Sequence, residues 1–234
     1  MDTQTRHALK KDKFAQAAAS SASWIGEHKS SVLRWVIVAG VAVVLIAGGL
    51  TFWFVRASAA DTALGAAMDI YATPLAPPGA PPEQGVYTAS ADRAKEANRE
   101  FVAVANDFGW LPAGSKAHYF AGVTYIELGQ NGLAEAQLTA ASHAWDRNLS
   151  NLAKVALAEL YHQTSRDSDA IDLYNQIIAK PSVTVSAEVA ELDLADLYAA
   201  EGKKDQARAL WAKVRDADKD GEAGQIAEQK LAGK

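Results

Sequence analysis

The sequence of 234 residues predicts an all-α protein in which one N-terminal transmembrane helix precedes a domain of repeated helix hairpins. An uncharged apolar run at 35–55 predicts the transmembrane helix, and apolar residues at helical spacing predict further helices from residue 91 onward. Tyrosines with similar neighbours recur at intervals of 36 and 37 residues, which indicates a repeat. The strand-like triplet at 183–185 is too short to form a strand.

Residues 34–56 are predicted to cross a membrane as a single helix. About 20 apolar residues at a rise of about 1.5 Å each span the hydrocarbon core of a bilayer. Trp35 and the aromatic triplet at 52–54 lie at the two ends of the run, where such rings favour the lipid headgroups. A cleaved signal peptide is the alternative, because the small residues at 57–59 resemble a cleavage site. We favour a spanning helix because the apolar run exceeds the usual length of about 7–15 residues.

The distribution of charge predicts the orientation of this helix. Six basic residues precede the run, whereas after Arg56 the next basic residue is Arg93. The positive-inside rule therefore places the N-terminus in the cytoplasm and predicts that the C-terminal part is exported. Residues 57–234 contain 16 Lys and Arg and 25 Asp and Glu, a net charge of −9, which disfavours nucleic acid and anionic lipid as partners. The absence of cysteine excludes disulfide and thiolate chemistry.

Composition divides the chain into four segments. They are a basic tail at 1–33, the membrane helix at 34–56, a helical extension with a proline-rich insertion at 57–90, and the repeat domain at 91–234. Five of the seven prolines lie within 74–85, which predicts a stiff extended connector. Residues 91–107 are predicted to form the second helix of a degenerate first repeat, with 57–73 as its first helix. A capping helix is predicted after about three full repeats.

The repeat is defined by positions that recur around three tyrosines, Tyr125, Tyr161 and Tyr198. A small residue lies three positions before each tyrosine, namely Gly122, Ala158 and Ala195. An alanine lies nine positions after each one, namely Ala134, Ala170 and Ala207. Four positions after the tyrosines come Gly129, Ser165 and Gly202. This spacing predicts a helix, a turn and a second helix, in which the small residue permits close approach and the aromatic ring fills the space beside it.

This pattern resembles the tetratricopeptide repeat, W-x2-L-G-x2-Y followed by A-x3-F. The first aromatic of the motif is replaced by His118, Lys154 and Glu191, and each repeat is two to three residues longer than the usual length of about 34. The layout of the whole chain is similar to that of the bacterial ancillary subunit of the Sec translocon. That resemblance implies a single-pass protein of the bacterial inner membrane with a periplasmic domain. It also implies protein partners, namely the translocon, periplasmic chaperones or envelope proteins.

The resemblance further implies a protein-binding groove on the first helices of the repeats. Its candidate residues are Tyr119, Val123, Ile126, Glu127, Val155, Glu159, His162, Leu192 and Asp196. The set is mixed apolar and acidic, and it lacks the Lys, Arg and Asn with which some relatives clamp a terminal carboxylate. An extended segment of basic character would suit it better. Alternatively, some of these residues only pack between repeats.

The sequence offers no recognisable catalytic constellation. The histidines have no H-E-x-x-H spacing, and neither a nucleophile elbow nor a phosphate-binding loop is present, so we expect neither enzyme activity nor a cofactor. Residues 216–221 (DADKDG) match the first half of a calcium loop. Ala227, however, stands where such a loop requires a glutamate, so a metal site is not expected.

The leading hypothesis is a membrane-anchored periplasmic scaffold or adaptor that serves exported proteins. The alternative is a structural component of a cell-envelope assembly or cell-division complex, held together by self-association. A stripe of small residues in the membrane helix, Ala39, Val43 and Ala47, is a weak cue for a homodimer.

Overall fold

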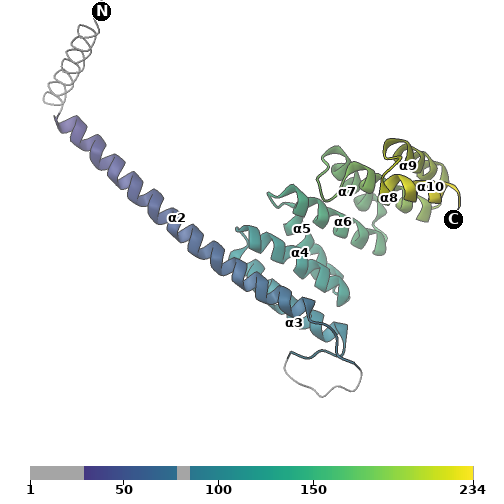
Figure 1. The fold of residues 1–234 in the computed structure, drawn as a ribbon, viewed down its shortest axis with the longest axis horizontal. Coiled ribbons are helices and arrows are strands. Elements are labelled where there is room, and N and C mark those ends of the chain that lie inside the picture. The colour runs from purple at the N-terminus through teal and green to yellow at the C-terminus, as the bar shows by residue number, and fades with distance from the viewer. Residues whose placement is uncertain (1–28, 78–84, 234) are drawn as a thin grey trace, which may run out of the picture. The chain divides into compact units, whose positions relative to one another are not determined.

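The computed structural model describes residues 29–77 and 85–233 (Figure 1). Every regular element in these two ranges is an α-helix, which confirms the predicted all-α class. The helices are α2 (Lys29–Ala72), α3 (Ser90–Phe108), α4 (Pro112–Glu127), α5 (Asn131–Ser142), α6 (Arg147–Gln163), α7 (Asp167–Ala179), α8 (Ala187–Ala200), α9 (Lys204–Ala217) and α10 (Glu222–Leu231). The predictions for the basic tail up to residue 28 and for 78–84 fall outside the described residues.

The chain divides into two compact units, 1–55 and 56–234. In the first unit the described residues form part of α2, which is long and apolar enough to cross a membrane. Thr51 carries the single hydroxyl of the apolar run, and it donates to the carbonyl of Ala47 at 2.9 Å. This donor therefore needs no partner from water, as a helix in hydrocarbon requires.

The second unit begins with the last turns of α2. Ala60, Leu64 and Ala67 are buried there in one core cluster with Ala97 and Phe101 of α3. Alanine and leucine at spacings of three and four residues form one apolar stripe, and this stripe faces α3. Residues 57–71 are therefore part of the folded unit.

The remaining helices form antiparallel hairpins that pack in chain order, each helix against the next (Figure 1). The positions that define the sequence repeat lie in the cores of these hairpins. Gly122, Ala134, Ala158, Ala170, Ala195 and Ala207 are buried, and Tyr125, Tyr161 and Tyr198 are partly buried. At Gly122 a β-carbon would lie 2.5 Å from Cγ of Leu138 on α5, so this position requires the close approach of two helices.

Three turns between helices have the same backbone geometry. Gly129, Ser165 and Gly202 have φ of 69°, 60° and 78°, in the left-handed region. In each turn the carbonyl of the repeat tyrosine accepts from the amide five residues later, with N–O distances of 2.9, 2.7 and 2.8 Å. These bonds satisfy carbonyls that a helix end would otherwise leave unpaired. The three hairpins α4–α5, α6–α7 and α8–α9 thus share one turn structure.

Candidate binding site

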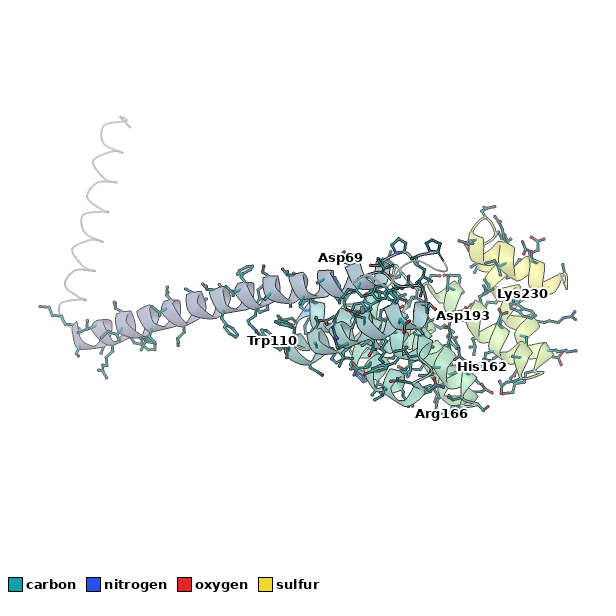
Figure 2. All side chains as sticks on the ribbon, turned by 90° about the horizontal axis from the view of Figure 1, so that it is seen from below. Asp69, Trp110, His162, Arg166, Asp193 and Lys230 are labelled. Carbon is teal, nitrogen blue, oxygen red and sulfur yellow. The ribbon has the colours of Figure 1, made fainter. Side chains whose placement is uncertain are left out.

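An acidic pocket of about 280 Å³ lies between α6, α7 and α8. Its walls are formed by Glu159, His162, Gln163, Tyr174, Asp193, Asp196 and Leu197. Figure 2 labels Asp193 and His162 on this part of the unit, together with Lys230 of α10. Three of the lining side chains are carboxylates, and the one lysine nearby approaches from α10.

Tyr174 lines the acidic pocket and also belongs to the hydrophobic core. It lies sixteen residues after Ala158, and both residues belong to the same core cluster, with Leu197 of α8. The side chain of Tyr174 is 5% exposed. Alanine at 158 leaves room for the phenol ring, and the ring fills the space between hairpins. The aromatic ring of Tyr174 thus serves the core while the residue also forms part of the pocket wall.

The acidic pocket disturbs the ionisation of two of its residues, Asp193 and Tyr174. Burial raises the pKa of Asp193, and the negative charges of Glu159 and Asp196 act in the same direction, so that together they raise it to about 6. Burial also raises the pKa of Tyr174, with further contributions from Asp193, Glu159 and Asp196. Like charges that share a small, partly buried volume disfavour ionisation, which explains both shifts. The pocket has a negative electrostatic potential at neutral pH.

Two of the pocket's polar groups have partners on neighbouring elements. Asp196 accepts from the indole Nε1 of Trp211 at 3.2 Å and from Nζ of Lys230 at 2.8 Å. Nδ1 of His162 pairs with the carboxylate of Asp167 at 2.6 Å. Asp196 is therefore the one pocket carboxylate that a cation of the described chain neutralises.

Glu159, Asp193 and the hydroxyl of Tyr174 form no hydrogen bond or ion pair with any residue that the structure describes. Glu159 is exposed and Asp193 is half-buried, so both carboxylates are within reach of solvent. Two carboxylates and a largely buried tyrosine without partners on the described chain, in one pocket, are an arrangement that a ligand with several donors would complete.

The structure brings three of the predicted groove residues together, since Glu159, His162 and Asp196 all line the acidic pocket. Tyr119 lies beyond the pocket on α4. Its pKa is raised by burial and by the charge of Glu159, which places the two side chains near each other. Tyr119 also packs against the core between α4 and α6, and it does not line the acidic pocket.

Other predicted groove residues contribute to packing. Leu192 is 9% exposed and lies in a core cluster with Val214 and Ala223, so it faces the interior of the last hairpins. Val155 packs against the core between α6 and α8, and Ile126 packs against the core between α4 and α6. These apolar side chains lie where burial removes their surface from water.

Two further predicted residues lie at the other end of the hairpin row. Glu127 accepts a hydrogen bond from the hydroxyl of Tyr71 on α2. Val123 is partly buried on α4. Neither residue lines the acidic pocket.

Sequence reasoning did not identify Tyr174, Asp193, Gln163 or Leu197 as site residues. Tyr174 occupies the repeat position held by Leu138 and Trp211, which indicated packing alone. Its hydroxyl was the available signal, since a buried tyrosine ordinarily needs a polar partner. Asp193 was not predicted because the repeat register placed its neighbour Leu192 in the groove instead.

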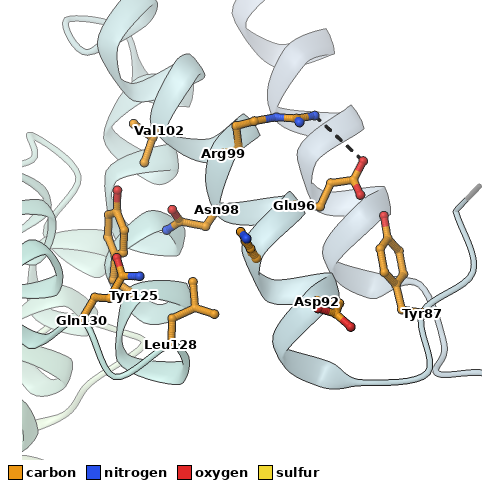
Figure 3. Close-up of a pocket in the computed structure, with 10 residues that line it drawn as sticks. Tyr87, Asp92, Glu96, Asn98, Arg99, Val102, Tyr125, Leu128 and Gln130 are labelled. Atoms are coloured by element: carbon orange, nitrogen blue, oxygen red, sulfur yellow. Dashed lines mark ion pairs between the residues drawn. The ribbon is translucent and has the colours of Figure 1, made fainter.

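A second, larger pocket of about 650 Å³ lies between α3 and the end of α4 (Figure 3). Several of its polar groups already have partners. Arg99 pairs with Glu100 at 2.8 Å and lies 3.9 Å from Glu96, and Asn98 donates to the hydroxyl of Thr124 at 2.9 Å. Its lining holds two acidic and two basic residues, so this pocket lacks the net charge with which the acidic pocket can attract a ligand.

The described residues contain no group of three or more His, Asp or Glu side chains arranged to hold a metal ion. In the 216–221 segment, the carboxylate of Asp218 accepts from the backbone amide of Gly224 at 3.3 Å. This contact closes the turn between α9 and α10. The segment thus has a structural role at the start of the last helix.

Comparison of the chain with protein-family models, with curated proteins and with solved structures found no match.

Proposed function

We propose that this protein is a membrane-anchored scaffold that binds segments of other proteins, and that it serves as an adaptor for exported chains beside a translocon. The observation that carries the proposal is the acidic pocket, in which Glu159, Asp193 and Tyr174 lack partners on the described chain. A site built from side chains of two successive hairpins is suited to an extended polypeptide that crosses both.

The repeated hairpins support a tetratricopeptide-like solenoid. The three turns at Gly129, Ser165 and Gly202 share one hydrogen-bond pattern, and the small residue of each first helix is buried. In such a solenoid the first helices form a concave surface, and α4, α6 and α8 hold these positions here. The acidic pocket would then lie in the concave groove.

Helix α2 supports a membrane anchor, and the basic residues before the apolar run support its orientation. We place the tail in the cytoplasm and the unit from Arg56 onward in the bacterial periplasm. In that location the acidic pocket meets newly exported chains, and electrostatic attraction favours those with basic segments.

Photocrosslinking in the native cell tests this function. A photoreactive amino acid at Tyr119, Glu159 or Asp196 should capture exported chains or translocon subunits, which mass spectrometry would identify. Asp172, exposed on α7 and outside the acidic pocket, is the matched control position. If the groove positions and Asp172 capture the same proteins in the same yield, the proposed function is wrong.

A structural role in an envelope assembly is the second candidate, and one surface favours it. Trp145 in the α5–α6 loop and Val183 in the α7–α8 loop are fully exposed and line one open hollow of about 600 Å³. Apolar side chains that gather in one exposed patch often mark a protein contact. For the assembly role, the double variant Trp145→Ser, Val183→Ser should reduce the mass of the detergent-solubilised protein, measured by light scattering. An unchanged monomer in both forms argues against it.

A further inference from the structure

We propose that the acidic pocket receives the cationic end of one lysine or arginine side chain from the bound protein segment. The inference rests on the proposed function and specifies its chemistry. The occupant must supply positive charge, several hydrogen-bond donors and a slender stem. Lysine and arginine side chains combine these properties.

The charges of the acidic pocket call for one additional cation. Lys230 neutralises Asp196, and His162 is engaged with Asp167. Glu159 and Asp193 have no cationic partner among the described residues, and their mutual repulsion with Asp196 contributes to the raised pKa of Asp193. A ligand cation placed between them would replace repulsion by attraction in a partly desolvated site.

Tyr174 is the observation that points to a hydrogen-bonding ligand. Tyr174 is 5% exposed, it lines the acidic pocket near the three carboxylates, and its hydroxyl has no hydrogen bond to the described chain. The hydroxyl oxygen can accept from an ammonium or guanidinium N–H, as both carboxylates can. Three acceptors then converge on one group, which matches the three donors of lysine and part of the five-donor fork of arginine.

Size and chemistry disfavour larger small molecules, anions and metal ions as occupants. The volume of about 280 Å³ lies just below the range of about 300–1,000 Å³ typical of pockets for whole small molecules, and it suits a single long side chain. Anions are repelled by the carboxylates. The side chains of the described residues are not arranged to bind a metal ion. The leucine at the wall, Leu197, offers an apolar surface for the methylene stem.

Equilibrium binding of short fluorescent peptides to the full chain in detergent micelles tests the proposal. The peptides consist of Gly, Ser and Ala with one central residue, which is Lys, Arg or Gln, and anisotropy is measured at low salt near pH 7.5. The Lys and Arg peptides should bind about tenfold or more tightly than the Gln peptide. The double variant Glu159→Gln, Asp193→Asn should abolish this preference, and Tyr174→Phe should weaken it about threefold while the ring preserves the core.

The matched control is the double variant Asp172→Asn, Glu228→Gln, which makes the same change of charge at exposed positions outside the pocket. It should keep the preference for Lys and Arg. Equal binding of the Lys and Gln peptides overturns the proposal, as does an equal loss of preference in the pocket and control variants. If n-butylammonium binds as tightly as the Lys peptide, a protein segment is not the ligand and the proposal is also overturned.

These results are separable from a failure of the proposed function. Crosslinks from the groove to cellular proteins, without a preference for Lys peptides, refute only the lysine and arginine pocket. A preference for Lys peptides in vitro, without groove crosslinks in the cell, refutes the scaffold function instead.

Discussion

Gly122 on α4 lies so close to Leu138 on α5 that a β-carbon on residue 122 would be 2.5 Å from Cγ and 2.7 Å from Cδ2 of the leucine. Leu138 is fully buried, so it has little room to move. The same separation of sixteen residues relates Ala158 to Tyr174 in the next hairpin. The first helix of a hairpin thus carries a small residue where the second helix presents a large one.

Gly122→Ala is therefore expected to destabilise the second unit. The new methyl group overpacks the contact at a cost of about 1–3 kcal/mol, while the better helix propensity of alanine returns about 1 kcal/mol. The net loss should be up to about 2 kcal/mol, seen as a lower midpoint of thermal unfolding by circular dichroism of the full chain in detergent.

Gly132→Ala is the matched control for this substitution. Gly132 lies in α5, and a β-carbon there would meet nothing within 4 Å. The control should raise stability by up to about 1 kcal/mol through helix propensity alone. Equal effects of the two substitutions would show that the contact with Leu138 imposes no restraint.

The close contact at Gly122 illustrates what a sequence of this kind predicts well. Spacings of 36 and 37 residues predicted which small residues meet a neighbouring helix and which residues form the turns, because these features depend on local geometry repeated three times. The all-α class followed from the same periodicity. The prediction that residues 57–73 form the first helix of a degenerate repeat rested on a much weaker resemblance to the repeat pattern. The place of residues 57–71 in the folded unit became clear only from the buried stripe of α2.

Ser165 is the non-glycine residue with positive φ among the described residues, at 60°. A β-carbon in the left-handed region costs about 1–2 kcal/mol, which Gly129 and Gly202 avoid at the equivalent turns. Ser165→Gly is expected to stabilise the unit by about 0.5–1 kcal/mol after the greater flexibility of the unfolded chain is included.

The measurement for Ser165→Gly is the denaturant midpoint of the full chain, compared with Ser165→Ala. The hydroxyl of Ser165 makes no hydrogen bond to the described residues, so alanine should change stability little. A decrease in stability with glycine would contradict the strain that we infer from the backbone.

The raised pKa of Asp193 predicts an unusual dependence of stability on pH. The ordinary pKa of an aspartate is about 4, and in the folded protein that of Asp193 is raised to about 6. Between these two values the folded state holds a proton that the unfolded chain has lost. The contribution of Asp193 to stability therefore falls as pH rises from about 4 to 6, and it stays low above pH 6.

Asp193→Asn tests this dependence because asparagine is neutral at every pH. The variant should be more stable than the parent at pH 7, by up to about 2 kcal/mol after solvent screening, and this gain should shrink towards pH 4. The groups that face Asp193 are Glu159 and His162 of α6, Tyr174 of α7 and Asp196 of α8. Asp172→Asn, exposed on α7, is the control. A gain that is constant with pH would mean that Asp193 does not carry the effect.

The acidic pocket was only partly predictable for a physical reason. Transferring the repeat register placed Leu192 in the groove, but burial of the leucine against Val214 and Ala223 decides how α8 is turned. One residue corresponds to about 100° of helix rotation, so Asp193 enters the pocket beside Asp196. Tyr174 comes from α7, which a groove built from first helices alone does not include. Which residues line the pocket depends on the packing of three helices, and the spacing of residues within one repeat does not reveal it.

Lys230 provides the last prediction, because it links the final helix to the acidic pocket. Its Nζ lies 2.8 Å from Oδ2 of Asp196, and both side chains are about 40% exposed. Lys230→Ala removes this cation and leaves Asp196 without its charged partner, which makes the pocket more negative. The variant should bind the Lys peptide about two- to fivefold more tightly than the parent at low salt, with the gain reduced at high salt.

Lys230→Arg is the matched control, since it keeps the charge and should leave the affinity unchanged within about twofold. Lys213→Ala, which removes a cation paired with Glu191 instead of a pocket residue, controls for the change in net charge. If Lys213→Ala and Lys230→Ala increase the affinity equally, general attraction explains the result and Lys230 has no specific influence on the pocket. A loss of affinity in Lys230→Ala alone would mean that the ion pair positions Asp196 for the ligand, and the predicted gain in affinity would be wrong.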